Sequence, residues 1–518
     1  MQHQRDAIPD AQARNSPGGT GWVVQKFGGT SLGKSIVTIA ENIILTGLQQ
    51  HRIAVVCSAR STKTKSEGTT NRLLHAAGDV LVADSCKYAD IVEGVRINHV
   101  TAGQAVIDDK GMLEQYIAHV DKECDHLFKV LESARFLKAV TNQTKDMIIS
   151  AGEKLSCLLM TALLRTKGAN AVFVDLGEII DLSSPIISVG DGFYRVLAHN
   201  ISTKILALGP DVVPVITGFF GKVPGGLLKE VGRGYTDLCA ALTAVGLRAR
   251  ELQIWKEVNG VFTADPSKVP TARLLKTVTP AEAAELTFYG SEVVHPFAMD
   301  QVVRASIPIR IKNVINPRSA GTVICSDPAD VISEKAPLGL FRTRSVLDPE
   351  PKRPTAVTAK PNITVLNIHA KKRARAHGFL ASIFSILDQN GLSVDLISSS
   401  EVHISMAIHL EDGLLASSGG EDELQIRSQA LQRAVNGLKT WGDVDLVPNQ
   451  AIISLVGRQM RGMKGVSGHF FSTLGENGIN IEMISQGASE ISIGCVINER
   501  ETARALNIVH ANLFGFLD

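Results

Sequence analysis

The stretch from Trp22 to Ser35, WVVQKFGGTSLGKS, decides the fold of the first half of the chain. An apolar run leads into the glycine pair Gly28-Gly29, and hydroxyl side chains then open a helical pattern. This order predicts a strand, a tight turn and a helix N-terminus, a combination well suited to bind phosphate. Lys26 places a cation at the end of the strand, beside the turn.

Two interpretations of this stretch compete. In the first, Lys26 is the phosphate-binding lysine and Gly28-Gly29 forms the turn. In the second, residues 28–35 match the P-loop pattern G-x-x-x-x-G-K-[ST], and Lys34 binds phosphate. A run that resembles a Walker B strand, AVFVD at residues 171–175, keeps the P-loop interpretation open. The rest of the chain has to decide between the two lysines.

Composition excludes several classes of protein. The 518 residues predict two or more domains, and 44% hydrophobic residues suffice for packed cores. A net charge of +1 provides no basic field for nucleic acid. No apolar run reaches the ~20 residues of a membrane span, and we expect a cytoplasmic protein that binds no membrane. Seven scattered cysteines without a C-x-x-C pair predict reduced thiols and no zinc site.

Strand and helix patterns alternate from residue 22 to about residue 325, which predicts an α/β domain with a largely parallel sheet. Residues 1–21 are polar and predict a disordered extension. Polar clusters follow several strands. Glu153 and Asp237 each have a plain alternative role in helix capping, and His295 in structural support. Arg233 lies between two glycines and is suited to grip a carboxylate or phosphate.

Five segments in this order resemble the aspartokinase family, and its monofunctional fungal form most closely: KFGGTS (26–31), SAGEKLS (150–156), GRGYTD (232–237), WKEVNGVFTADP (255–266) and GSEVVHP (290–296). The resemblance runs from Trp22 to the C-terminus, and we expect a monofunctional kinase rather than a bifunctional kinase–dehydrogenase. It implies the amino-acid-kinase (carbamate-kinase-like) fold over residues 22–325, in which Lys26 rather than Lys34 faces the phosphates.

The resemblance also implies a reaction. Aspartokinases transfer the γ-phosphoryl group of ATP, with Mg²⁺, to the β-carboxylate of L-aspartate, the first step toward threonine, methionine and isoleucine. By resemblance, the catalytic residues are Lys26 and Asp237. The residues implied to bind ATP and its phosphates are Lys26, Gly28, Gly29, Thr30, Ser31, Lys256, Glu257, Phe262 and Lys268. Those implied to bind aspartate are Thr70, Glu153 and Arg233, with His295 as possible support. No metal site made of protein ligands alone is predicted.

Four positions, in three places, depart from the commoner bacterial pattern of this family. Lys256-Glu257 replaces a threonine-aspartate pair, Ser267 replaces an arginine, and Glu292 replaces a lysine. The last two changes remove cations near ATP, and either Lys256 or Lys268 would have to substitute for them.

The second half of the chain predicts a regulatory region. Residues 326–354 read as a linker, and the segment 384–398 recurs as 471–485. Each copy pairs a helix ending at Asn-Gly with alternating strands, which predicts two βαββαβ units. These units resemble tandem ACT domains, the first over 361–448 and the second over 449–518. Because the second copy ends early, we expect strand 355–360 to complete it, so that the first domain is inserted within the second.

By resemblance, the regulatory region binds an amino acid made downstream of aspartate, threonine more than lysine, and joins subunits into a homo-oligomer. The candidate effector-binding residues are Asp395, Ser400, Glu401, Asn480, Ile484 and Gln486. Ordinary strand and turn chemistry is the alternative for the serine and Asn480. Two other functions stay open: a glutamate, acetylglutamate or uridylate kinase of the same fold, and a catalytically silent amino-acid sensor.

Overall fold

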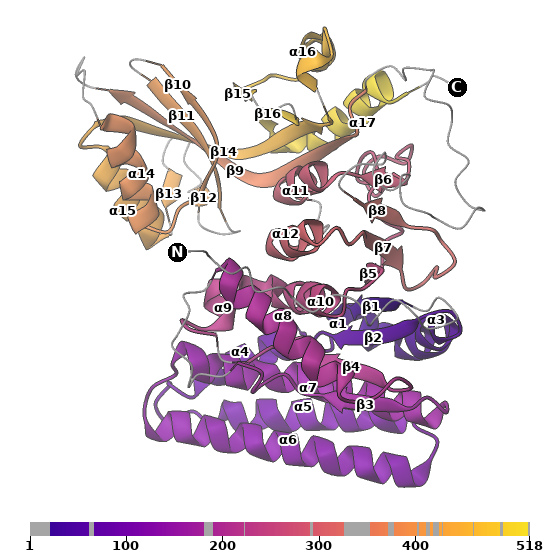
Figure 1. Cartoon of the computed structure of the whole chain (residues 1–518). Coiled ribbons are helices and arrows are strands. Elements are labelled where there is room, and N and C mark those ends of the chain that lie inside the picture. Colours follow the sequence, from indigo (N-terminus) through magenta and orange to yellow (C-terminus); the bar gives the residue numbers. More distant parts are fainter. Residues whose placement is uncertain are drawn as a thin grey trace, which may run out of the picture. The chain divides into compact units, whose positions relative to one another are not determined.

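The computed structural model of the chain (Figure 1) describes most of the sequence. The described residues are 21–61, 67–180, 190–221, 223–290, 294–325, 353–370, 378–400, 403–410, 415–417, 424–426, 428–458, 460–486 and 491–515. The predicted extension 1–21 and linker 326–354 lie almost wholly outside them. The chain divides into two units, residues 1–259 with 295–326 and residues 260–294 with 327–518. Residues 260–294, which we predicted to lie in the catalytic domain, thus belong to the second unit.

The first unit is built on a sheet whose strands run in the order β3-β4-β2-β1-β5-β7-β8. All neighbouring strands are parallel except the antiparallel pair β7 and β8. Their bounds are β1 (Trp22–Phe27), β2 (Arg52–Cys57), β3 (Ala171–Val174), β4 (Val213–Thr217), β5 (Glu251–Lys256), β7 (Ile309–Asn313) and β8 (Thr322–Ile324). Nearly every residue of β1 is buried, because helices cover a parallel sheet on both faces. The predicted α/β domain is therefore confirmed.

Helices connect these strands. Their bounds are α1 (Gly29–Lys34), α2 (Ile36–Thr38), a π-helical segment (Ile39–Leu45), α3 (Thr46–Leu48), α4 (Thr69–Asp79), α5 (Lys87–Gln104), α6 (Lys110–Phe136), α7 (Asn142–Thr166), α8 (Asp191–Leu206), α9 (Leu227–Glu230), a 3₁₀ turn (Gly232–Gly234), α10 (Tyr235–Gly246) and α12 (Pro296–Arg304). Figure 1 shows α5 and α6 as long neighbouring helices on the side of α7 away from the sheet.

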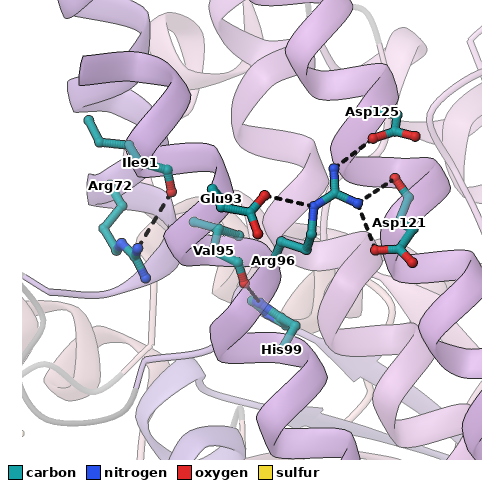
Figure 2. Close-up of polar contacts among 8 residues, drawn as sticks. All are labelled: Arg72, Ile91, Glu93, Val95, Arg96, His99, Asp121 and Asp125. Atoms are coloured by element: carbon teal, nitrogen blue, oxygen red, sulfur yellow. Dashed lines mark hydrogen bonds and ion pairs between the residues drawn. The ribbon is translucent and has the colours of Figure 1, made fainter. Parts of the chain in front are cut away.

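A network of ion pairs joins α5 to α6. The Arg96 guanidinium lies 2.6 Å from carboxylate oxygens of both Asp121 and Asp125 on α6, and 3.1 Å from Glu93 on its own helix (Figure 2). Tyr116 of α6 packs against Gly103 of α5, where a Cβ atom would come within 2.2 Å of the ring. These contacts hold the two helices in register at close range.

Helix α7 differs from its sequence-based prediction. It begins at Asn142, with the Thr141 hydroxyl as N-cap, and not near Ser150. Glu153 therefore lies in the middle of a buried helix, and its alternative role in capping is wrong. This helix is also long and apolar enough to cross a membrane by length and composition, but 78% of its apolar window is buried within the protein, as in the core helices of globular domains.

The second unit contains a sheet in the order β10-β11-β9-β14-β16-β15. The strands are β9 (Ala356–Ala370), β10 (Val394–Ser399), β11 (His403–His409), β14 (Gly442–Val456), β15 (Met483–Ser485) and β16 (Ser492–Asn498). A small hairpin, β12 (Leu415–Ser417) with β13 (Leu424–Ile426), and β6 (Thr277–Val278) complete the described strands. The helices are α11 (Pro280–Phe288), α14 (Phe379–Gln389), α15 (Gln429–Leu438), α16 (Val466–Glu476) and α17 (Thr502–Leu513), with 3₁₀ turns Met460–Gly462 and Glu499–Glu501.

Two long strands link the repeats. The predicted strand 355–360 is the first part of β9, which continues without a break to Ala370. Residues 356–360 pair with the second half of β14, whereas 363–370 pair with its first half. Each half of the sheet thus has the strand order 4-1-3-2 of a βαββαβ unit. This pairing is compatible with the predicted insertion, with long shared strands in place of separate short ones.

Candidate active site

Lys26 and Asp237 form an ion pair at the C-terminal end of the central strand β1. The Lys26 Nζ atom lies 2.8 Å from Oδ1 of Asp237, which stands in the first turn of α10. Burial by itself would raise the pKa of Asp237, but the ammonium groups of Lys26 and Lys256 outweigh it and hold this pKa below its ordinary value. The backbone N–H of His295 also donates to this carboxylate. Asp237 is therefore an ionised anchor for Lys26 and does not cap its helix, since the N-cap residue is Gly234.

The predicted phosphate turn follows directly. Gly28 is the extended N-cap of α1, and Gly29 is its first residue. A Cβ atom on Gly29 would lie 2.1 Å from the Ala59 carbonyl oxygen, so glycine is needed for this close approach. Thr30 is half-buried, and the buried Ser31 hydroxyl donates to Oε1 of Glu257 at 2.6 Å. The predicted nucleotide residue Glu257 is thus tied to the turn.

The structure argues against the P-loop interpretation. That motif needs an open loop from its first glycine to its lysine, but residues 29–34 form helix α1. Lys34 is exposed in the last turn of this helix. Asp175, the Walker B candidate, lies 3.1 Å from the Lys154 ammonium. The assignment of the phosphate-binding lysine to Lys34 is therefore wrong, and Lys26 is the remaining candidate for this role.

Glu153 is a buried carboxylate that lies against the Tyr235 hydroxyl and the backbone of Ala59. The Tyr235 hydroxyl donates to Oε1 at 2.7 Å, whereas Oε2 has no hydrogen-bond partner among the described residues. Burial raises the pKa of Glu153 to about 7, although the bond from Tyr235 opposes the rise. The half-buried Thr70 hydroxyl also interacts with Tyr235. The structure thus brings two of the predicted aspartate-binding residues together around a tyrosine.

Arg233 lies at the centre of the 3₁₀ turn Gly232–Gly234, between α9 and α10, and its side chain lies outside the described part of the chain. The preceding helix is fixed by the buried Asp146 of α7, which accepts hydrogen bonds from the backbone N–H groups of Leu227 and Leu228. The backbone that carries Arg233 is therefore anchored to the same helix as Glu153.

His295 is the N-cap residue of α12 and packs against the turn that carries Arg233. A Cβ atom on Gly234 would lie 1.9 Å from the His295 ring, so the two residues fit only with glycine at this position. Burial lowers the pKa of His295, despite the nearby Asp237 carboxylate, and the ring is neutral at pH 7. The structure therefore places His295 beside the Lys26–Asp237 pair.

The other predicted nucleotide residues are divided between the units. Lys256 ends β5 and acts electrostatically on Asp237 in the first unit. Phe262 and Lys268 belong to the second unit, as does Ser267, whose hydroxyl donates to Asp265. Glu292, the other departure from the bacterial pattern, lies outside the described residues.

The predicted effector residues do not gather at one site. The Asp395 carboxylate is 4% exposed and lies 2.7 Å from the Lys360 ammonium, at the edge of a cavity of about 350 Å³. Ser400, Asn480 and Gln486 are exposed and bond to neighbours in the chain or on α16. Ile484 is 48% exposed on β15. Glu401 lies outside the described residues.

Two side chains that contact the predicted site residues, Tyr235 and Lys360, were not predicted from the sequence. Tyr235 lies inside the GRGYTD motif, but a tyrosine in a helical pattern reads as a core residue until its hydroxyl is seen on Glu153. Lys360 lies on a strand of alternating pattern, far from Asp395 in sequence, and only the strand order brings the two side chains together.

Comparison with known proteins identifies the class. A model of the amino acid kinase family matches residues 21–313, and an ACT domain model matches residues 453–513. The chain therefore belongs to the amino acid kinase family, whose members are phosphotransferases.

The relatives narrow this assignment. The chain is 47% identical over 519 residues to the aspartokinase of Candida albicans, covering 98% of this chain and 92% of the relative. It is 48% identical over 507 residues to the aspartokinase of Schizosaccharomyces pombe, covering 95% and 93%. The structure of E. coli aspartokinase III in complex with lysine and aspartate (T-state) matches with a TM-score of 0.72 and 25% identity, over 95% of this chain and 99% of that one. The chain is thus a member of the aspartokinases, as its motifs predicted.

Proposed function

We propose that the protein transfers the γ-phosphoryl group of ATP to the β-carboxylate of L-aspartate and forms 4-phospho-L-aspartate. The observation that carries this proposal is Glu153, a buried carboxylate whose free oxygen is suited to an ammonium group, on the helix that anchors the backbone of Arg233. An acid for the ammonium and an arginine for the α-carboxylate are what an amino acid requires. A carbamate or a nucleoside monophosphate has no such ammonium. Related structures include E. coli aspartokinase III in complex with aspartate and ADP, at 25% identity.

Catalysis in this proposal is charge neutralisation and positioning. The β-carboxylate of aspartate is already ionised at pH 7, with an ordinary pKa of about 4, so no general base is needed. The obstacle is the approach of one anion to another. Lys26, held by Asp237, places its ammonium group where charge develops on the transferring phosphoryl group. Lys256, whose charge acts on the same carboxylate, adds a second cation and substitutes for those missing at Ser267 and Glu292.

The residues present fit a Mg²⁺ ion that arrives with the nucleotide. Among the described residues, no group of three His, Cys, Asp or Glu side chains could hold a metal by itself. Mg²⁺ commonly binds through substrate phosphates and one or two carboxylates, and Asp237 is the ionised carboxylate beside Lys26. When bound, the ion would neutralise phosphate charge.

For regulation, we propose feedback inhibition by an amino acid bound to the ACT region, with threonine as the effector. The resemblance to the fungal form of the family favours threonine, while a related bacterial structure is in complex with lysine. Asp395 is the predicted effector residue with the strongest structural support, because it borders a cavity. We further propose a cytoplasmic homo-oligomer assembled through this region.

The test is ATP- and Mg²⁺-dependent formation of acyl phosphate on aspartate, trapped with hydroxylamine. The parent protein should form hydroxamate, and threonine should suppress it. Lys26→Ala should abolish the reaction with the fold intact, whereas the matched variant Lys34→Ala, at the exposed end of α1, should keep nearly full activity. A folded protein that binds aspartate but forms no hydroxamate would support a silent sensor instead.

A further inference from the structure

A loop in the second unit carries two of the predicted nucleotide contacts, Phe262 and Lys268. It is closed at its base by an antiparallel bridge between Phe262 and Leu274, and by backbone hydrogen bonds from Thr263 to Arg273 and from Leu275 to Val261. At its tip, Asp265 accepts bonds from the backbone and hydroxyl of Ser267. We call residues 261–275 the nucleotide loop. Its two ends are fixed to each other, so its position depends on what it packs against.

The nucleotide loop packs against the second ACT domain. Ala264 and Val269 are buried in a core that includes residues of β9, β14, β16, α16 and α17. The backbone N–H of Val357 on β9 donates to the Thr263 carbonyl at 2.8 Å. On α17, the Asn507 side-chain amide donates to the Lys268 carbonyl at 2.7 Å. The terminal helix thus holds the very residue whose side chain is predicted to approach ATP.

His510 of α17 is the buried centre of this contact. Its ring is 2% exposed, with Nε2 2.8 Å from the Thr263 hydroxyl and Nδ1 3.2 Å from the Thr271 hydroxyl. Burial and the nearby Arg273 lower the pKa of His510, so the ring is neutral at pH 7. The backbone N–H of Arg273 already donates to the Thr263 hydroxyl, which leaves that hydroxyl free to donate to Nε2. The proton on Nδ1 then points to Thr271, and a single tautomer satisfies both sides of the loop.

We propose that His510 is a positioning residue for ATP binding: from the last helix of the regulatory region it clamps the two sides of the nucleotide loop and thereby sets the position of Phe262 and Lys268. This inference rests on the proposed role of those two residues in nucleotide binding. By this contact the ACT region contributes to ATP affinity, independently of any effector site.

The geometry predicts a graded series of variants. His510→Phe keeps a ring stacked on Phe514, whose centroid lies 5.2 Å away, but leaves both threonine hydroxyls without the imidazole. His510→Gln can still accept the hydrogen bond from Thr263 while losing Thr271. Thr271→Val removes one bond from the exposed side of the loop and leaves the core intact. Thr502→Val is the matched control, because it removes a hydroxyl bond on α17 that does not touch the loop.

The experiment measures steady-state kinetics of the full chain with ATP and aspartate varied in turn, together with melting temperatures. His510→Phe should raise KM for ATP about tenfold with KM for aspartate nearly unchanged, His510→Gln and Thr271→Val should raise it about threefold, and Thr502→Val should leave it unchanged. Parallel increases in both KM values, or a lower melting temperature without a change in KM for ATP, would overturn the inference.

Lys268→Ala separates this inference from the proposed function. If Lys268→Ala raises KM for ATP and the His510 and Thr271 variants do not, the nucleotide contact stands and the positioning role of His510 is wrong. If none of these variants changes KM for ATP, the proposed nucleotide contact is itself wrong, and the inference falls with it while the hydroxylamine assay still tests aspartate kinase activity.

Discussion

Removing the charge of the buried Glu153 carboxylate should increase the stability of the protein and decrease its affinity for aspartate. Glu153→Gln keeps the shape of the side chain and an acceptor for Tyr235, but removes the charge. The free protein should become more stable, because an ionised carboxylate at 1% exposure with one unengaged oxygen is costly. The same change should weaken aspartate binding, because the substrate ammonium would lose its charged partner.

The pKa of Glu153 determines how large the change in the free energy of unfolding should be. Burial raises the pKa of Glu153 from 4.5 to about 7, and each pKa unit corresponds to about 1.4 kcal/mol. Ionised Glu153 therefore lowers the free energy of unfolding by about 3 kcal/mol. Because the folded pKa is raised, the penalty is absent below pH 4.5 and grows as pH rises toward and through 7. The advantage of Glu153→Gln should thus be close to zero at pH 4 and reach about 3 kcal/mol at pH 8.

The assay is urea unfolding of parent and variant from pH 4 to pH 8, with KM for aspartate measured on the same samples. A bond between charged groups is worth about 1.5–3 kcal/mol, so KM for aspartate should rise about 10- to 150-fold at pH 8. Glu123→Gln is the matched control, since Glu123 is a partly exposed carboxylate paired with Lys154, and this variant should leave KM for aspartate unchanged. A Glu153→Gln variant that is equally destabilised at every pH would refute this reasoning.

Three further changes test other parts of the molecule. Gly234→Ala should reduce kcat strongly, because its Cβ atom would lie 1.9 Å from the His295 ring; circular dichroism should show an intact fold, and full activity would contradict the packing. Arg96→Met should lower the free energy of unfolding by about 1 kcal/mol in low salt, and the loss should shrink in 1 M salt because it arises from three ion pairs. Asp395→Asn should destabilise the second unit by about 3 kcal/mol by leaving the Lys360 ammonium, 17% exposed, without its counter-charge; calorimetry would show no change if that pair is dispensable.

The sequence predicted the α/β domain and the ACT repeat, because each depends on local pattern. The motifs KFGGTS and GRGYTD singled out Lys26 and Asp237, but only the structure shows their ion pair. It did not predict the start of α7. Residues 142–149 carry no strong helix signal beyond the Thr141 cap, whereas Ser150 precedes a well-formed helical pattern. The buried position of Glu153 came only from the packing of this helix.

The pairing of strands that lie far apart in the chain also could not be predicted from local sequence patterns. The sequence predicts strand 355–360 as the missing strand of the second repeat, but its fusion with the next strand into β9 depends on pairing with both halves of β14. Likewise, a kinase motif such as WKEVNGVFTADP gives no sign that its second half, from Gly260 onward, packs with the regulatory unit. Such assignments need the tertiary contacts of Val269 and His510.

The local arrangement of charged side chains near the site determines the pKa values of its two carboxylates, Asp237 and Glu153. The chain has a net charge of only +1, so its affinity for a polyanion must come from local arrangement. Lys26 and Lys256 keep Asp237 ionised by lowering its pKa, and Asp237 in turn fixes the Lys26 ammonium without a ligand. No described cation offsets the burial of Glu153, and its pKa is raised instead. An ammonium-bearing substrate would supply the missing charge, so that aspartate binding should lower the pKa of Glu153 and release up to one proton near pH 7.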